Sequence, residues 1–315
     1  MTITREYASP VDTASYGDYQ FVRQPGDDRP LYRFGGRIAA SASATGTESW
    51  PAEPGRYHLY AGWFCPWSQR ITIAIALHGL CDTIGVSYLD DSRDGRGWAF
   101  RERRGADPVN GFTLLREAYQ ATDPGFDGHI STPALWDRKQ RRLVSNDYRS
   151  LGLDIATEFP AYGDPAIDSY PVEHRAEIDE LDRWLGPTVN HGVSRAATDQ
   201  DARAALLDAF DILDVRLTNQ RYLLGSEITE ADIRLFVTLV RYDVQANADH
   251  VINPGLAEYP QLWAYARDLY AHPAFGATTD FSSFAAPGVA IPDWQRPSGR
   301  ESLADRGSEI RKAYR

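Results

Sequence analysis

The chain has 315 residues, of which 43% are hydrophobic and 24% charged, so it has the composition of a globular protein long enough for two domains. A formal net charge of −11 disfavours nucleic acid as a partner, because phosphate binding needs a basic face. The longest apolar run, 71–77, is far shorter than the roughly 20 residues of a spanning helix, and Met1 begins no signal-peptide core, so we expect a cytoplasmic protein with no membrane partner.

Residues 1–52 are rich in Gly, Pro, Ser, Asp and Arg, with scattered aromatic side chains. This composition favours an N-terminal extension that wraps around the protein instead of forming its own core. Alternating side chains then predict a strand over 57–61. Pro66 fits the first turn of a helix, where its missing N–H does no harm, and the apolar stretch 71–77 continues that helix as a buried element.

The next part of the chain alternates strands with irregular segments. A second strand is expected over 86–89, followed by a Gly- and Arg-rich insertion, 91–128, with one helix near 114–121. Another strand is expected after Pro133. We therefore place a strand-and-helix domain at 53–165.

From about residue 174 the pattern becomes helical, and we expect a helical domain with a C-terminal tail at 166–315. Thr229 and Asp232 form a variant capping box, in which each side chain bonds the backbone N–H of the other. A strand-containing first half and an all-helical second half predict an α+β chain. Apolar residues recur at spacings of three and four at Ile178, Leu181, Trp184, Leu185, Leu206, Ala209, Phe210, Leu213 and Leu217.

The chain has two cysteines, Cys65 and Cys81, which are too far apart on one predicted helix to form a disulfide. Cys65 stands between the predicted strand and helix, where unpaired N–H groups and the helix dipole favour a thiolate; Arg70 adds positive charge one turn later. A thiolate attacks sulfur, so we expect Cys65 to be the nucleophile. The alternative is a small buried core residue. Cys81 lacks this setting and is expected to be structural.

A second group of candidates follows the insertion. If the bond before Pro133 is cis, the backbone of Thr132 can pair with a peptide-like thiol, although trans is the usual isomer. Asp147 is placed to hold a ligand ammonium group, with Ser145 or Asn146 capping the next helix; the alternative is a simple N-cap cluster. The histidines are dispersed and Cys65 has no His or Cys at ligand spacing; His78 lies one helical turn before Cys81, but two such residues without further partners favour a structural role, so no metal site is expected.

These motifs resemble the glutathionyl-hydroquinone reductases, the Xi class of the glutathione transferases. The family's Cys-Pro-Trp-Ala-His-Arg is matched by 65–70, and its Gly-Trp-x-Phe by 97–100. Its Val-Pro-Val-Leu-Trp-Asp and Ile-Val-Ser-Asn-Glu-Ser are similar to 132–137 and 143–148. The likeness runs from about residue 19 to 285 and includes the strings 221–225, 229–236, 259–263 and 267–270.

The resemblance implies a thioredoxin-like thiol-binding domain at 53–165 and an all-helical, glutathione-transferase-type domain at 166–315. It implies that Cys65 is the nucleophile, that Trp98 covers the bound thiol, and that Asp147 replaces the Glu that binds the γ-glutamyl end. The backbone of Thr132 would pair with the cysteinyl unit. The full candidate set for thiol binding is Arg70, Trp98, Thr132, Pro133, Asn146 and Asp147.

The activity implied by the resemblance is reductive cleavage of a glutathione–hydroquinone thioether. Cys65 would attack the substrate sulfur and keep it as a mixed disulfide, which a second thiol would resolve. The expected partners are a small-molecule thiol, an aromatic or quinol-type conjugate and, as is typical of the family, a second copy of the chain.

Several positions depart from the family. Tyr148 stands in place of a Ser, Ser194 in place of a Tyr in the acceptor pocket, and His129 in place of an Arg. The Tyr-Tyr near the family's C-terminus finds no counterpart at 284–288. These changes predict either a re-specialised hydroquinone-conjugate reductase or a different thiol. Nearly all basic residues are Arg, which is typical of high-GC genomes, and in an actinobacterium mycothiol would replace glutathione.

Two further hypotheses stay open. One is a serine- or tyrosine-type transferase that forms no covalent intermediate, for which Tyr60 and Ser68 are the candidates. The other is a catalytically silent thiol-binding protein that keeps the fold.

Overall fold

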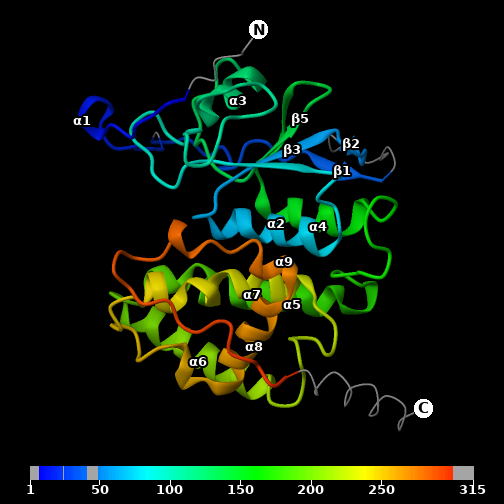
Figure 1. Ribbon diagram of the computed structural model, residues 1–315, viewed down its shortest axis with the longest axis vertical. Coiled ribbons are helices and arrows are strands. Elements are labelled where there is room, and N and C mark those ends of the chain that lie inside the picture. The colour runs from blue at the N-terminus through cyan, green and yellow to red at the C-terminus, as the bar shows by residue number, and fades with distance from the viewer. Residues whose placement is uncertain (1–6, 24, 41–48, 301–315) are drawn as a thin grey trace. The chain divides into compact units, whose positions relative to one another are not determined.

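A computed structural model describes residues 7–23, 25–40 and 49–300. The chain divides into two units, Met1–Pro165 and Ala166–Arg315 (Figure 1). Parts of the predicted extension and the C-terminal tail after residue 300 lie outside the described residues. The first unit contains strands and helices and the second contains helices, which confirms the predicted α+β class.

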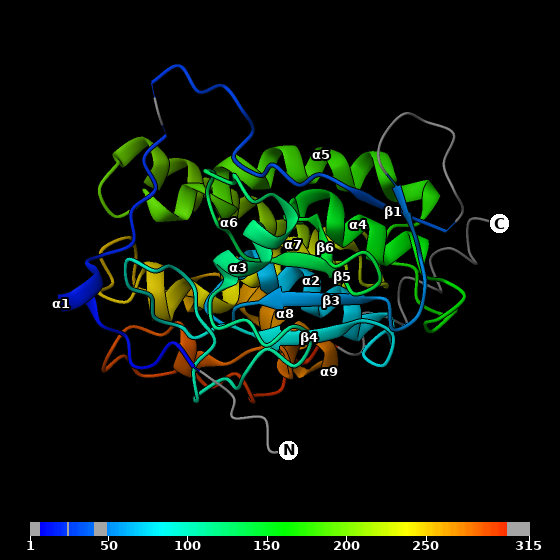
Figure 2. The same cartoon turned by 90° about the horizontal axis from the view of Figure 1, so that it is seen from above.

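The first unit is built on a four-stranded mixed sheet in the order β4-β3-β5-β6 (Figure 2). β3 (Tyr57–Ala61) pairs in parallel with β4 (Gly85–Tyr88) and antiparallel with β5 (Ala134–Asp137). β5 pairs antiparallel with β6 (Arg142–Ser145). The predicted strand 57–61 is confirmed, and the strand expected at 86–89 begins and ends one residue earlier.

Helices cover both faces of this sheet, which explains why every residue of β3 is buried. α2 (Pro66–Leu77) and α4 (Tyr148–Glu158) lie together on one face, and α3 (Leu115–Thr122) lies on the other (Figure 1). α2 is buried on nearly all sides, and its buried residues include the polar Ser68, Gln69 and Arg70 as well as most of the apolar stretch 71–77. The sheet therefore holds the end of β3 and the start of α2 in a rigid setting.

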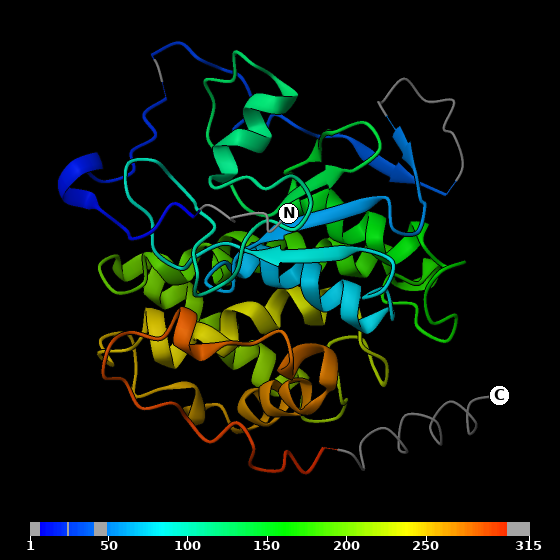
Figure 3. The same ribbon diagram turned by 45° about the horizontal axis from the view of Figure 1, so that its top comes forward.

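The N-terminal segment contributes to the same core, which its composition did not predict. After α1 (Thr13–Tyr16), β1 (Arg37–Ala39) and β2 (Ser49–Pro51) form a two-stranded parallel pair (Figure 3). They bury the side chains of Ile38 and Trp50 in the core under the sheet.

Two contacts fasten this segment to the unit. The Arg37 guanidinium donates to the buried Asp154 carboxylate of α4, with Nε at 2.9 Å from Oδ1. Residues 34–36 run beside β6, where the Gly36 N–H donates to the Val144 carbonyl at 3.0 Å and the Asn146 N–H to the Phe34 carbonyl at 2.9 Å. The segment thus adds hydrogen bonds along the outer edge of the sheet.

The second unit is helical. The predicted capping box is confirmed at the start of its central helix, where the Asp232 carboxylate accepts from the Thr229 N–H and hydroxyl, each at 2.8 Å. In the described part of the chain, no helix reaches the length and apolarity needed to span a bilayer. The α-helices of the second unit are α5 (Arg175–Leu185), α6 (Gln200–Arg216), α7 (Glu230–Arg241), α8 (Pro260–Ala271) and α9 (Pro273–Gly276). This unit also has π-helical turns at Gly186–Asn190 and Tyr242–Ala246 and 3₁₀ turns at Val172–His174, Gly192–Ser194, Leu256–Glu258 and Phe281–Ser283.

Candidate active site

Cys65 occupies the junction between β3 and α2, so the predicted strand–Cys–Pro–helix order is confirmed. It is the N-cap residue of α2: its backbone is extended, and its sulfur accepts from the Ser68 N–H at 3.4 Å. Pro66 follows at the first helical position. The sulfur thus lies at the positive end of the helix dipole, which favours a thiolate. The residue is 6% exposed, so only a small part of it reaches solvent.

The segment around Pro133 lies beside this sulfur. The Thr132–Pro133 peptide bond is cis. The Cys65 Sγ lies 3.5 Å from the Thr132 carbonyl oxygen, and the Thr132 hydroxyl donates to the carbonyl of Tyr60 at 3.1 Å. The Ser68 and Thr132 hydroxyls are 3.2 Å apart. Two segments far apart in the sequence are therefore joined directly at the candidate nucleophile.

A group of packed aromatic side chains lies near Cys65. Tyr148 stacks on Trp67, with ring centroids 4.7 Å apart, and meets the edge of Tyr32 at 5.6 Å. The Arg70 guanidinium lies over the Trp67 ring, with its central carbon 4.7 Å from the ring centroid, so its positive charge contacts the same group of rings. Burial, together with the nearby Tyr148 and Cys65, raises the pKa of Tyr32 to about 12. Tyr32 was not among the predicted site residues, and no motif marks it.

Trp98 packs against the residue that precedes the nucleophile. Its indole ring stacks on Phe64 with centroids 4.1 Å apart and planes inclined by 21°. The Arg93 guanidinium also contacts this ring, with its central carbon 4.4 Å from the Trp98 centroid. The predicted cover residue is therefore held firmly beside Cys65.

The residues after β6 divide into two roles. Asp147 is itself the N-cap of α4, so the expectation that Ser145 or Asn146 caps this helix is wrong. Its half-buried carboxylate accepts from the Arg149 N–H at 3.2 Å. Asn146 is fully buried, and its amide points into the protein because its Nδ2 donates to the Tyr119 hydroxyl at 3.1 Å. Asn146 thus positions the site without facing it.

The alternative candidates are placed unfavourably. Tyr60 is fully buried, its hydroxyl donates to Asp107 at 3.2 Å, and burial raises its pKa, all of which oppose a role in activating a thiol. Ser68 is buried next to Cys65 and accepts from the Gly62 N–H at 3.2 Å. Cys81 is exposed and lies beyond the end of α2, so it is not part of the buried core.

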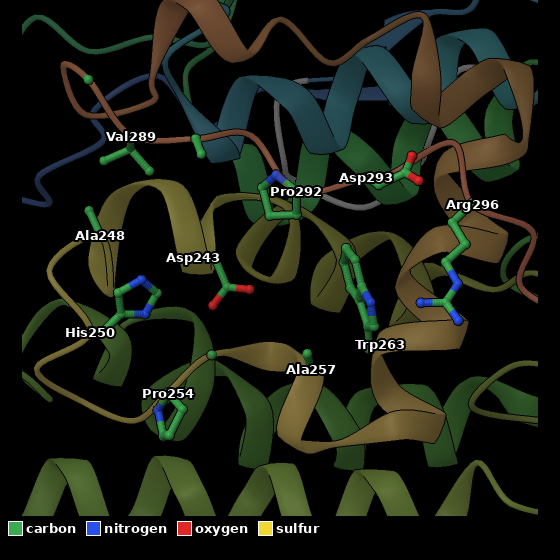
Figure 4. A pocket seen from close by; sticks show the side chains of 13 residues that line it. Asp243, Ala248, His250, Pro254, Ala257, Trp263, Val289, Pro292, Asp293 and Arg296 are labelled. Atoms are coloured by element: carbon green, nitrogen blue, oxygen red, sulfur yellow. The ribbon is translucent and has the colours of Figure 1, made fainter.

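Two cavities are lined by residues of one unit each. In the first unit, about 260 Å³ lies between the N-terminal segment and α3, bounded by Tyr19, Gln20, Phe21, Arg116, Gln120, Phe126, Asp127, Gly128 and Ile130. In the second unit, about 490 Å³ lies around the Asp243 carboxylate, which points between His250 and Trp263 (Figure 4). The second cavity is lined only by residues 243–296 and contains no cysteine. Among the described residues, no group of His, Cys, Asp or Glu has the arrangement of a metal site.

A thioredoxin-like unit with a cysteine before its first long helix, followed by a helical unit, defines a protein of the glutathione transferase superfamily. Residues 173–268 match the family described as "Glutathione S-transferase, C-terminal domain". The chain is similar to the glutathionyl-hydroquinone reductase PcpF of Sphingobium chlorophenolicum, with 38% identity over 70% of this chain and 73% of PcpF. It is 36% identical to the glutathionyl-hydroquinone reductase YqjG of Escherichia coli, over 78% of this chain and 82% of YqjG.

Solved structures agree. The glutathione-bound structure of YqjG has a TM-score of 0.77 and covers 84% of this chain and 95% of its own, at 32% identity. The Xi-class glutathione transferase of Natrialba magadii has a TM-score of 0.78 at 31% identity, covering 86% of this chain and 91% of its own. The chain therefore belongs to the glutathionyl-hydroquinone reductase family, the Xi class of the glutathione transferases, and it is an enzyme of that superfamily.

Proposed function

We propose that this enzyme reductively cleaves thiol conjugates of the glutathionyl-hydroquinone type and that Cys65 is its nucleophile. The observation that carries the proposal is the position of the Cys65 sulfur, which caps α2 and lies 3.5 Å from the Thr132 carbonyl beside cis-Pro133. Relatives named glutathionyl-hydroquinone reductase support the substrate class.

The reaction has two sulfur-transfer steps. The Cys65 thiolate attacks the thioether sulfur of the conjugate, forming an S–S bond as the carbon–sulfur bond breaks. The electron pair of the broken bond stays on the ring carbon, and this carbon leaving group is stable enough because it departs as an enolate. The enolate then takes up a proton to give the hydroquinone. A second thiol then attacks the mixed disulfide, releasing the Cys65 thiolate and a disulfide of the two thiols. The ring carbon is reduced, and the two thiol sulfurs are oxidised.

Three groups are proposed to bind the thiol. The Thr132 N–H has no hydrogen-bond partner among the described residues, so it can pair with the cysteinyl unit as an extended strand would. The half-buried Asp147 carboxylate would hold an ammonium group, and Trp98 would cover the thiol. Arg70, Pro133 and Asn146 are proposed to position these thiol-binding groups.

The identity of the thiol forms a separate part of the proposal. Glutathione is the first candidate, since a glutathione-bound relative has the same fold. Mycothiol is the second, because the Tyr148 ring stands where the family has a Ser hydroxyl and lies stacked on Trp67 at 4.7 Å. A comparison of the two thiols by the shift each causes in the melting temperature tests this, since a bound ligand stabilises the folded state by mass action.

The nucleophile can be tested with a matched pair of variants. Cys65→Ser should abolish turnover of a glutathionyl-hydroquinone conjugate and should carry no thiol adduct in its intact mass. Cys81→Ser is the control, because Cys81 is exposed and lies outside the helix that Cys65 caps. Its turnover and adduct should equal those of the wild type. A Cys65→Ser enzyme with full activity would favour the non-covalent transferase and end the proposal.

Two other parts of the proposal have simple tests. If no low-molecular-weight thiol shifts the melting temperature or forms an adduct, the proposed thiol-dependent cleavage is wrong. A homodimer is proposed as in the family, and sedimentation velocity of the full chain measures it.

A further inference from the structure

The guanidinium of Arg93 lies close to two aromatic rings and has no anionic partner among the described residues. Its central carbon is 4.3 Å from the Tyr19 ring centroid and 4.4 Å from the Trp98 centroid. Among the described residues it makes no ion pair and no hydrogen bond. Burial lowers the pKa of this guanidinium, but arginine stays charged in proteins. A half-buried cation with unused N–H donors thus stands beside Trp98.

Arg93 lacks an ion pair although the same loop contains several acidic residues. Each neighbouring carboxylate is already taken by another arginine, so Arg93 keeps its full charge for an outside group. A guanidinium carries its donors in a planar fork that matches a carboxylate. The occupied pairs are Asp90 with Arg101, Asp91 with Arg104, and Asp94 with Arg96.

Two ring contacts connect Arg93 with the residue before Cys65. The Trp98 ring stacks at 4.1 Å on Phe64, the residue before Cys65, and Arg93 is 4.4 Å from the same ring. In a peptide-like thiol, a carboxylate one residue beyond the cysteinyl unit is roughly 7–9 Å from the sulfur, at about 3.8 Å per Cα step. The contacts from Phe64 to Trp98 and from Trp98 to Arg93 are 4.1 and 4.4 Å long, and we take them as the path along which such a carboxylate would lie.

His129, which stands where the family has an Arg, does not supply this charge. Its Nδ1 lies 3.3 Å from the Tyr19 hydroxyl, and burial together with the positive Arg93 lowers its pKa. Both effects favour the neutral imidazole. Arg93 brings a guanidinium to the same cluster from a different loop.

We propose that Arg93 is the anion-recognition residue of the thiol site and binds a carboxylate of the thiol co-substrate through its edge. The inference rests on the proposed function and names its substrate class: a thiol with a free carboxylate next to the cysteinyl unit, such as glutathione. Tyr19 and Trp98 hold the guanidinium in place.

The test compares glutathione with its glycyl monoester, which lacks only that charge. Both ligands are titrated into the Cys65→Ser protein by calorimetry, so that no covalent step interferes. Glutathione should bind about 10- to 100-fold more tightly than the ester, the range for a charge-assisted bidentate contact. Adding Arg93→Gln should weaken glutathione to the level of the ester and leave the ester unchanged, whereas Arg93→Lys should restore part of the preference.

Arg96→Gln is the matched control, since Arg96 also lies over a tyrosine, Tyr16, at 4.1 Å but is bound to Asp94. It should keep the full preference for the acid. Equal binding of acid and ester, or a preference that survives Arg93→Gln, would overturn the proposal. Loss of the preference in Arg116→Gln instead would assign the carboxylate to the 260 Å³ cavity and would also overturn it.

Failure of this inference is distinct from failure of the proposed function. With Cys65 intact, a thiol adduct that forms equally well from acid and ester removes the role of Arg93 and leaves the nucleophile in place. Absence of any adduct removes the proposed function itself.

Discussion

Asp232 stabilises the start of α7, and its replacement tests how the helical unit is held together. The carboxylate is fully buried and accepts four hydrogen bonds: Oδ1 from the Leu223 N–H at 2.9 Å and the Tyr265 hydroxyl at 2.8 Å, and Oδ2 from the Thr229 N–H and hydroxyl. In Asp232→Ala two backbone N–H groups lose their acceptor where water cannot replace it. Each such donor costs about 1–3 kcal/mol, so the free energy of unfolding should fall by about 2–6 kcal/mol.

Asp232→Asn separates the hydrogen-bond argument from a general loss of packing. The amide keeps one acceptor oxygen, and the two hydroxyls can reorient to accept from its NH₂ group. Only one backbone N–H then faces a donor, so the loss should be about half as large, about 1–3 kcal/mol.

The measurement is chemical denaturation of each full-length variant. Asp199→Ala is the control, because Asp199 caps α6 at the surface and accepts from the N–H groups of Asp201 and Ala202 at 3.0 Å. An exposed cap of this kind contributes about 1 kcal/mol. Equal losses for Asp232→Ala and Asp232→Asn, or a loss in Asp232→Ala no larger than in the control, would refute the reasoning.

Two predictions concern the first unit. Burial lowers the pKa of His58 to about 4, so between pH 6.5 and 4 the unfolded chain binds a proton that the folded chain does not. The wild type should therefore lose up to about 3 kcal/mol as the pH falls through this range, and His58→Gln should lose less; parallel denaturation curves would contradict this. Asn146→Ala removes the acceptor of the Phe34 N–H and the donor to the Ser131 hydroxyl. The free energy of unfolding, measured by chemical denaturation, should fall by about 2–4 kcal/mol, and an unchanged denaturation midpoint would count against this.

The sequence predicted the parts of the fold that local rules decide. The strand at 57–61 followed from alternation, the helix start from Pro66, and the capping box from the spacing of Thr229 and Asp232. The pairing of β1 with β2 was not predictable, because strands of three residues carry too little periodicity to stand out from a Gly- and Pro-rich segment.

The site was predicted where a motif marks it and missed where only tertiary contacts do. Cys65 has a strand before it and a proline after it, a local pattern that predicts the cap. Tyr32 and Arg93 reach the site from segments with no motif, and their roles depend on rings that lie far away in the sequence. The expectation that Ser145 or Asn146 caps α4 failed because Ser, Asn and Asp in a row all fit an N-cap, and the burial of Ser145 and Asn146 leaves Asp147 as the cap.

The run of residues 34–36 beside β6 has a consequence for shorter versions of this protein. β6 is the last strand of its sheet, and the Phe34 and Gly36 backbone groups bond to it at Asn146 and Val144. A chain trimmed to begin at the thioredoxin-like core would leave those groups open, and an uncovered strand edge recruits strands from other molecules. The N-terminal segment thus covers a strand edge that we expect to promote association between molecules when it is exposed.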